Sequence, residues 1–68
     1  MENIFPKRLK EAIDRKGINQ SELAKRLGIR RETIWKYLTG KIEPSCAILR
    51  GLCFELGVSA DYLLGLVD

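Results

Sequence analysis

The sequence predicts an all-α fold of five short helices. Apolar residues recur every three or four positions between glycines and prolines, which is the spacing of helices with one buried face. Residues that commonly cap helix N-termini precede several of these segments. No segment alternates apolar and polar residues between hairpin turns, so strands are not expected. A chain of 68 residues is long enough for one domain, which is predicted to cover residues 1–68.

Two helices are predicted before residue 30, at residues 5–16 and 20–27. The first ends at Gly17, and its apolar stripe consists of Phe5, Leu9, Ala12 and Ile13. Asn19 is expected to cap the second helix, with Glu22 in the position that completes a capping box. The second helix ends at Gly28, and its apolar side consists of Leu23, Ala24 and Leu27.

Three more helices are predicted after the second. The third begins near Arg31 and ends at Gly40; its inward residues are Ile34, Tyr37 and Leu38, and its outward residues are Arg31, Glu32, Trp35 and Lys36. Ser45 caps the fourth, which ends at Gly57 and has the inward stripe Cys46, Leu49, Leu52, Cys53 and Leu56. Ser59 caps the last, short helix, whose inward residues are Tyr62, Leu63 and Leu66.

The composition argues against several classes of function. The chain has no histidine and only two cysteines, so no metal site, catalytic residue or cofactor is expected. Cys46 and Cys53 lie on one predicted helix with Cα atoms about 10.5 Å apart, which is too far for a disulfide. They are expected to be buried and reduced, and an intermolecular bridge is the alternative. Without a membrane-length apolar run or a secretory signal at residues 1–6, a cytoplasmic location is expected.

Positive charge is concentrated in the middle of the chain. Residues 25–41 contain six basic residues and one acid, a net charge of +5. Residues 42–68 contain one basic residue and four acids, a net charge of −3. A localised basic patch of this kind is typical of proteins with a polyanionic partner.

Residues 20–38 have the spacing of a helix-turn-helix. Ala24 is small where two helices would cross, and Gly28 can adopt the left-handed conformation that turns the chain sharply. Ile29 and Ile34 would fill the angle between the helices. The second helix of the pair then protrudes, and a helix about 10–12 Å across fits the major groove of duplex DNA.

With these residues the sequence resembles the phage repressor and Cro-type helix-turn-helix proteins, the XRE family. The matching segments are INQSELA at 18–24, LGI at 27–29, TI at 33–34, GK at 40–41, PS at 44–45 and LGVS at 56–59, with Asp61, Leu63 and Leu64. The resemblance covers nearly the whole chain. It implies a compact five-helix lambda-repressor-like DNA-binding domain in which the second and third helices form the helix-turn-helix.

The resemblance also implies which residues would contact DNA. The residues expected to contact base edges are Arg31, Glu32, Lys36, Thr33 and Arg30. Arginine and lysine bond guanine and glutamate accepts from cytosine, so a half-site with guanine–cytosine pairs is expected. For Glu32 the alternatives are an ion pair with Lys36 or a favourable interaction with the helix N-terminus.

A second set of residues is expected to contact the DNA backbone. These residues are Gln20, Asn19, Lys25, Arg26, Thr39, Lys41 and Trp35. Lys25 and Arg26 have the alternative of being solvated surface charges. Trp35 has two alternatives, which are packing on thymine methyl groups or sugar, or lying partly buried beside Thr39 or Arg31.

The sequence departs from the family at two places. Many members have an arginine where this chain has Ile13 and a glutamate where it has Leu38, and the two form an ion pair; here an apolar contact between Ile13 and Leu38 is expected. Arg30 takes the place of the usual serine or threonine cap, which predicts a less satisfied N-terminus for the third helix that phosphate could complete.

A homodimer is expected, because family members often dimerise through their last two helices. The residues assigned to its interface are Ala47, Ile48, Gly51, Phe54, Leu64 and Val67. Small residues on the fourth helix would let a partner helix approach closely, and the alternative is an apolar monomer surface.

The predicted function is sequence-specific binding of double-stranded DNA by a transcriptional regulator, most simply a repressor that binds an inverted-repeat operator as a dimer. No membrane and no small-molecule substrate is expected as a partner, and an enzyme is not expected. The alternative is a protein–protein interaction module or antitoxin-type partner that retains the fold.

Overall fold

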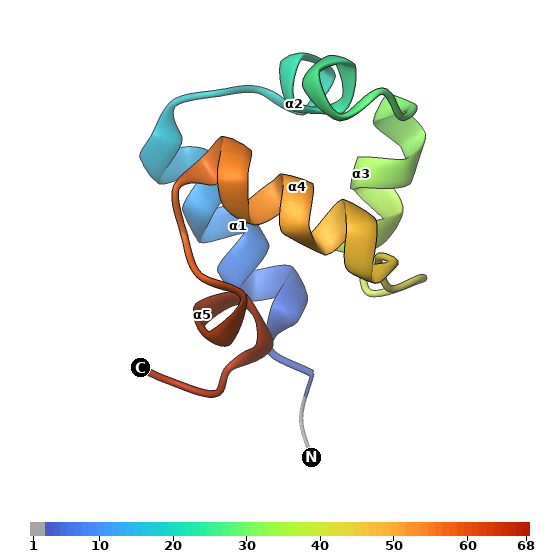
Figure 1. Ribbon diagram of the computed structural model, residues 1–68. Coiled ribbons are helices and arrows are strands. Elements are labelled where there is room, and N and C mark those ends of the chain that lie inside the picture. Colours follow the sequence, from blue (N-terminus) through green and yellow to red (C-terminus); the bar gives the residue numbers. More distant parts are fainter. Residues whose placement is uncertain (1–2) are drawn as a thin grey trace.

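The computed structural model describes residues 3–68 and shows five α-helices and no strand within that range. The helices are α1 (Phe5–Lys16), α2 (Gln20–Leu27), α3 (Arg31–Leu38), α4 (Cys46–Leu56) and α5 (Ala60–Leu64). Figure 1 shows α4 crossing in front of α1, with α2 and α3 on one side of the molecule and α5 near the C-terminus on the other. The predicted all-α class is confirmed. Residues 1 and 2 of the predicted domain lie outside the described residues.

Three predicted helix caps are confirmed. The Asn19 side chain accepts a hydrogen bond from the Glu22 amide at 2.8 Å, and the Ser45 and Ser59 hydroxyls accept from Ile48 and Tyr62 at 3.2 and 3.0 Å. The capping box predicted at α2 forms only this half. The Glu22 carboxylate instead accepts from Arg26 one turn further along, at 3.1 Å. Each of these caps satisfies an amide that the helix itself leaves without a partner.

The turn between α2 and α3 has the predicted geometry. Gly28 adopts a left-handed conformation with φ of 69°, and no other part of the chain would touch a side chain added there. The amide of Ile29 donates to the Ala24 carbonyl at 3.0 Å, which closes the end of α2. Glycine is therefore favoured here by backbone conformation and not by lack of space.

The core lies where all five helices meet. Its buried residues are Phe5, Leu9, Ala12, Ile13, Leu23, Ala24, Ile34, Tyr37, Leu52, Leu56 and Leu63. The rings of Phe5 and Tyr37 join α1 to α3 edge to face, with centroids 6.5 Å apart. Burial raises the pKa of Tyr37. The predicted inward stripes of α1, α2 and α3 contain most of these residues.

Two residues predicted to face inward are exposed, and one helix ends early. Cys46 is exposed because it is the first residue of α4, at the end that projects past the core. Leu66 is also exposed, because α5 ends at Leu64 and Gly65 then turns the chain away. α3 ends at Leu38, two residues before Gly40. Both cysteines are free, as expected, and desolvation raises the pKa of the half-buried Cys53 thiol.

Gly51 allows α4 to approach α2 closely. A Cβ atom at this position would lie 2.7 Å from Cδ2 of Leu27. The close approach expected of a partner helix is thus made by a helix of the same chain, and the explanation given for Gly51 from the sequence is corrected. The burial of Leu27 against this backbone fixes how α2 sits on α4.

The C-terminal segment is tied to α1 by Arg8. Its guanidinium donates to the backbone carbonyls of Tyr62, at 2.9 Å, and Val67. The same guanidinium lies 4.7 Å from the centroid of the Tyr62 ring. These contacts hold α5 against α1.

No helix within residues 3–68 is long and apolar enough to cross a membrane.

A matched pair of substitutions tests the assignment of α5 to the core. Leu63 is fully buried and Leu66 is 66% exposed. We expect Leu63→Ala to lower the free energy of unfolding by about 2–5 kcal/mol, because it leaves a cavity. Leu66→Ala should change it by less than about 0.5 kcal/mol. Urea denaturation followed by circular dichroism measures both, and equal effects would contradict the packing of α5.

Candidate nucleic-acid interface

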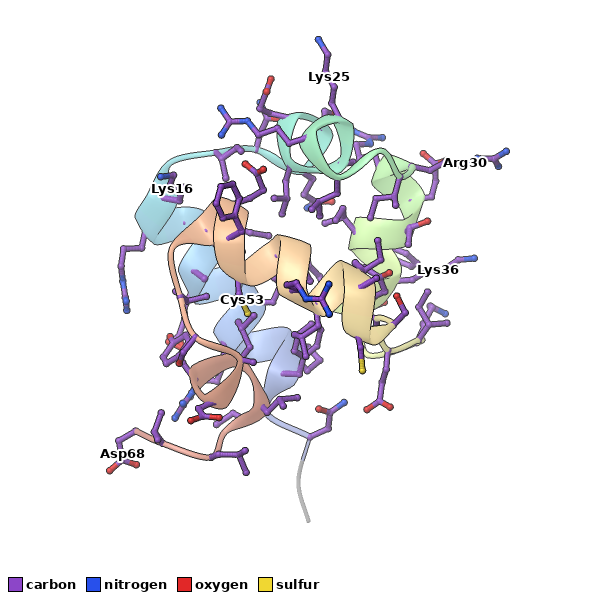
Figure 2. The ribbon with its side chains drawn as sticks, in the orientation of Figure 1. Lys16, Lys25, Arg30, Lys36, Cys53 and Asp68 are labelled. Carbon is purple, nitrogen blue, oxygen red and sulfur yellow. The ribbon has the colours of Figure 1, made fainter. Side chains whose placement is uncertain are left out.

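The outer face of α3 carries the charged residues that the sequence assigned to it. Ile34 and Tyr37 are buried against the core, whereas the residues on the opposite side are exposed. These exposed residues are Arg31, Glu32, Trp35 and Lys36. Figure 2 shows Lys25, Arg30 and Lys36 pointing outward from the side of the molecule formed by α2 and α3, while Asp68 lies at the other end. Basic side chains of residues 25–41 thus point outward on this side, although Glu55 from the acidic part of the sequence contacts Arg26 there.

A shallow hollow joins the start of α2 to the outer face of α3. It is lined by Gln20, Arg31, Glu32 and Trp35. The sequence assigned Gln20 to the DNA backbone, and the structure places it in the same hollow as Arg31. Donors, an acceptor and an aromatic surface thus meet on one side of the protruding helix.

Trp35 is held in a half-exposed position. Its side chain is 49% exposed, and the Lys41 ammonium lies 5.5 Å from the centroid of its ring. Thr39 ends the helix one turn later, where its hydroxyl donates to the carbonyls of Trp35 and Lys36 at 3.0 and 3.3 Å. Three residues assigned to the DNA backbone therefore lie together at the end of α3.

Glu32 is not paired with Lys36 in this structure. The ion pairs found among residues 3–68 join Lys10 to Asp14, and Arg26 to Glu22 and Glu55. The carboxylate of Glu32 and the ammonium of Lys36 are thus both available to a ligand. Thr33, the remaining residue of this face, is half-buried.

Arg26 has protein partners that the sequence did not predict. Its guanidinium contacts the carboxylates of Glu22 at 3.1 Å and Glu55 at 3.5 Å, and the hydrogen bond that it donates to Glu22 is the main reason that its pKa is raised. The contact with Glu55 links α2 to α4. Neighbouring Lys25 is exposed and has no ion pair in the described part of the chain.

The N-termini of α2 and α3 differ. Asn19 caps α2, so its side-chain oxygen is already used. Arg30 occupies the cap position of α3 without a side-chain hydrogen bond, as the sequence predicted. The first amides of α3 therefore lack a side-chain partner of the kind found at α2, α4 and α5.

The residues assigned to a dimer interface do not all share one face. Ala47 and Phe54 are exposed on α4, and Leu64 and Val67 are exposed near the C-terminus. Ile48 is half-buried against the core, and Gly51 faces Leu27 of the same chain. Helical spacing also places the exposed Arg50 between Ala47 and Phe54, a residue that the sequence assignment omitted. A count of helical positions from Phe54 would have found it.

The contact expected between Ile13 and Leu38 stays a prediction. Ile13 is buried in the core and Leu38 is half-buried against it.

Among the described residues no three histidine, cysteine or acidic side chains are grouped closely enough to hold a metal ion.

Comparisons with known proteins give one family and one relative. A family model described as a helix-turn-helix domain matches residues 7–68. The chain is 44% identical over 61 residues to the SPbeta prophage-derived uncharacterized HTH-type transcriptional regulator YonR of Bacillus subtilis (strain 168). The matched region covers 90% of this chain and 56% of that relative, so the chain spans little more than half of the relative's length.

The missing cap at α3 leads to a stability prediction. We expect Arg30→Asn to raise the free energy of unfolding by about 1 kcal/mol relative to Arg30→Ala, because asparagine supplies an acceptor to the first turn and alanine does not. Both variants remove the same charge, so their difference isolates the cap. Urea denaturation measures it. Equal stabilities would mean that these amides gain nothing from a side-chain acceptor.

Proposed function

This chain belongs to the helix-turn-helix domain family, as its resemblance to the repressor and Cro-type proteins indicated, and we propose that it binds double-stranded DNA sequence-specifically as a transcriptional regulator. The observation that carries the proposal is the protruding α3, whose exposed charged residues have no ion-pair partner in the described protein and lie beside Gln20. The name of the relative supports the same role, since it describes a transcriptional regulator.

In the proposed complex α3 enters the major groove. Arg31 bonds the O6 and N7 atoms of a guanine, Glu32 accepts from the N4 amino group of a cytosine, and Lys36 bonds guanine or phosphate. Thr33 and Arg30 flank these residues. No catalytic step is involved, and no cofactor is needed for recognition.

The backbone contacts surround this helix. Lys25, Lys41 and Thr39 are exposed beside α2 and α3 and would meet phosphates on either side of the groove. Asn19 and Gln20 approach the phosphates from the start of α2. Arg26 contributes less, because Glu22 and Glu55 already balance its charge. A phosphate near Arg30 would complete the N-terminus of α3.

A dimer is proposed to place two copies of α3 in successive major grooves. Such a dimer requires an inverted-repeat operator whose half-sites lie about 34 Å apart. Occupation of the operator would then repress transcription by blocking polymerase. The outward residues Ala47, Phe54, Leu64 and Val67 are the proposed contacts, with Arg50 at the edge.

A protein-interaction module or antitoxin-type partner is the second candidate. The observation that favours it is Phe54, an apolar side chain that is 83% exposed on α4. The exposed face of α4 would be covered by a protein under both proposals, by a second copy of the chain in the DNA-binding dimer and by another protein in the interaction module. The two functions differ in whether the basic face binds DNA of a particular sequence.

Selection from randomised duplex DNA tests the proposed function. We expect enrichment of an inverted repeat containing guanine–cytosine pairs, with an affinity that falls steeply as salt increases, because lysine and arginine displace counterions from phosphates. Arg31→Ala should weaken binding to the selected operator by about 10–100-fold and relax the preference at one guanine. Lys25→Gln should instead weaken binding to all sequences equally. Weak binding without enrichment would favour the interaction module.

Sedimentation equilibrium tests the proposed dimer. We expect the chain to be partly dimeric at high micromolar concentration and Phe54→Ser to be monomeric, because the substitution removes the largest exposed apolar side chain of α4. The variant should also need more protein to fill both half-sites of the operator. Trp35→Ala, on α3 and outside the proposed dimer contacts, serves as the control and should leave self-association unchanged. A monomer at all concentrations, with independent filling of the half-sites, would contradict the dimer.

A further inference from the structure

The tryptophan of α3 is an unusual side chain for a surface that binds a polyanion. Trp35 is 49% exposed, although the core of the molecule is immediately behind it at Ile34. About half of this apolar side chain remains in water, so a partner that covered it would gain from its burial. The basic residues around it indicate what the partner is, because Arg31, Lys36 and Lys41 would repel a basic surface and attract DNA.

The residues around Trp35 are of two kinds, one suited to the DNA backbone and one suited to base edges. Lys41 lies 5.5 Å from the ring centroid and is the group best suited to a phosphate on that side. The hollow beside the ring is lined by Arg31 and Glu32, which are suited to base edges, and by Gln20, which is assigned to phosphate. The ring therefore lies next to the two residues assigned to base edges.

The major groove offers one apolar group to such a ring. Among the base edges exposed there, only thymine presents a methyl group, on C5. Trp35 follows Arg31 by four residues, which places both on the same side of α3 one turn apart. A guanine bonded by Arg31 and a methyl group packed on Trp35 would consequently lie close together in the groove.

We propose that Trp35 is a specificity-determining residue that reads thymine through its 5-methyl group, next to the guanine bonded by Arg31. This inference rests on the proposed DNA binding and replaces the backbone contact assigned to Trp35 from the sequence. Gln20 and Arg31 line the hollow with the ring, and the Lys41 ammonium lies 5.5 Å from the ring centroid. Loss of one methyl group from such a contact weakens binding by about fourfold.

The test removes that methyl group without changing base pairing. The operator obtained by selection is resynthesised with each thymine in turn replaced by deoxyuridine, and the Kd of each duplex is measured by fluorescence anisotropy. We expect one position in each half-site, near the guanine that depends on Arg31, to lose about fourfold in affinity. With Trp35→Ala the same replacement should have no effect, and with Trp35→Phe, which keeps an aromatic ring, part of the effect should return.

Two controls separate base reading from general loss of binding. Leu66→Ala removes an exposed apolar side chain near the C-terminus, outside the proposed DNA contacts, and should keep the full deoxyuridine effect. Trp35 is the only tryptophan in the chain, so its fluorescence reports the site directly. Its emission should change more on binding the thymine duplex than on binding the duplex with deoxyuridine at the sensitive position.

Three results would overturn the proposal, and they are distinguishable. An operator without a thymine near the guanine that depends on Arg31, or one in which no single deoxyuridine weakens binding, rejects methyl reading while leaving DNA binding established. A deoxyuridine effect that is unchanged in Trp35→Ala assigns the methyl contact to another residue. Failure of the selection to enrich any sequence rejects the proposed function together with this inference.

Discussion

The angle at which α2 is fixed against α3 is the constraint on which the rest of the structure depends. Three small or specially shaped residues set it: Ala24 is buried at the crossing, Gly28 turns the chain in a left-handed conformation, and Gly51 lets α4 close on Leu27 from behind. A larger side chain at Ala24 or Gly51 would push α2 outward. Because α3 follows α2 after three residues, any such shift would move the whole charged face. Ile34 then locks α3 by burying its side chain completely.

Electrostatics reinforce this arrangement without contributing much to the core. Arg26 joins Glu22 of its own helix to Glu55 of α4, so α2 is held by a charged contact on the same side where Leu27 packs on Gly51. Arg8 holds the C-terminal segment at the other end of the molecule through backbone carbonyls. Arg26 and Arg8 thus have their binding partners within the protein. The cations on and around α3 are left for a polyanion, which is how a modest net charge of +3 produces a strongly basic face.

Local patterns in the sequence predicted most of the fold, because they depend on neighbours in the chain. The caps by Asn19, Ser45 and Ser59, the turn at Gly28 and the buried stripe of α1 each follow from residues within a few positions. The pairing of Arg26 with Glu55 and the packing of Gly51 on Leu27 join distant residues, and helical spacing on one element cannot show them. Periodicity also failed at helix ends: Cys46 and Leu66 continue an inward pattern beyond the point where the core stops. For the candidate site, the sequence placed the outer face of α3 correctly, but the shared hollow requires the structure.

Departures from the local rules of stability are concentrated on α3. Each of the other four helices has such a local feature: α1 has a proline in its first turn, and α2, α4 and α5 have a side-chain cap. α3 begins at Arg30 without a cap, places a positive charge at the positive end of its dipole and exposes Trp35. Each feature is unfavourable for the free energy of folding, which is modest in a chain of 68 residues because so short a chain buries a small fraction of its surface. A bound phosphate and a base edge would reverse all three effects, because the phosphate completes the helix N-terminus, the anion balances Arg30 and the methyl group covers the indole. Features that are unfavourable in the free protein thus become favourable on one kind of partner, which is the pattern expected of a surface shaped for binding.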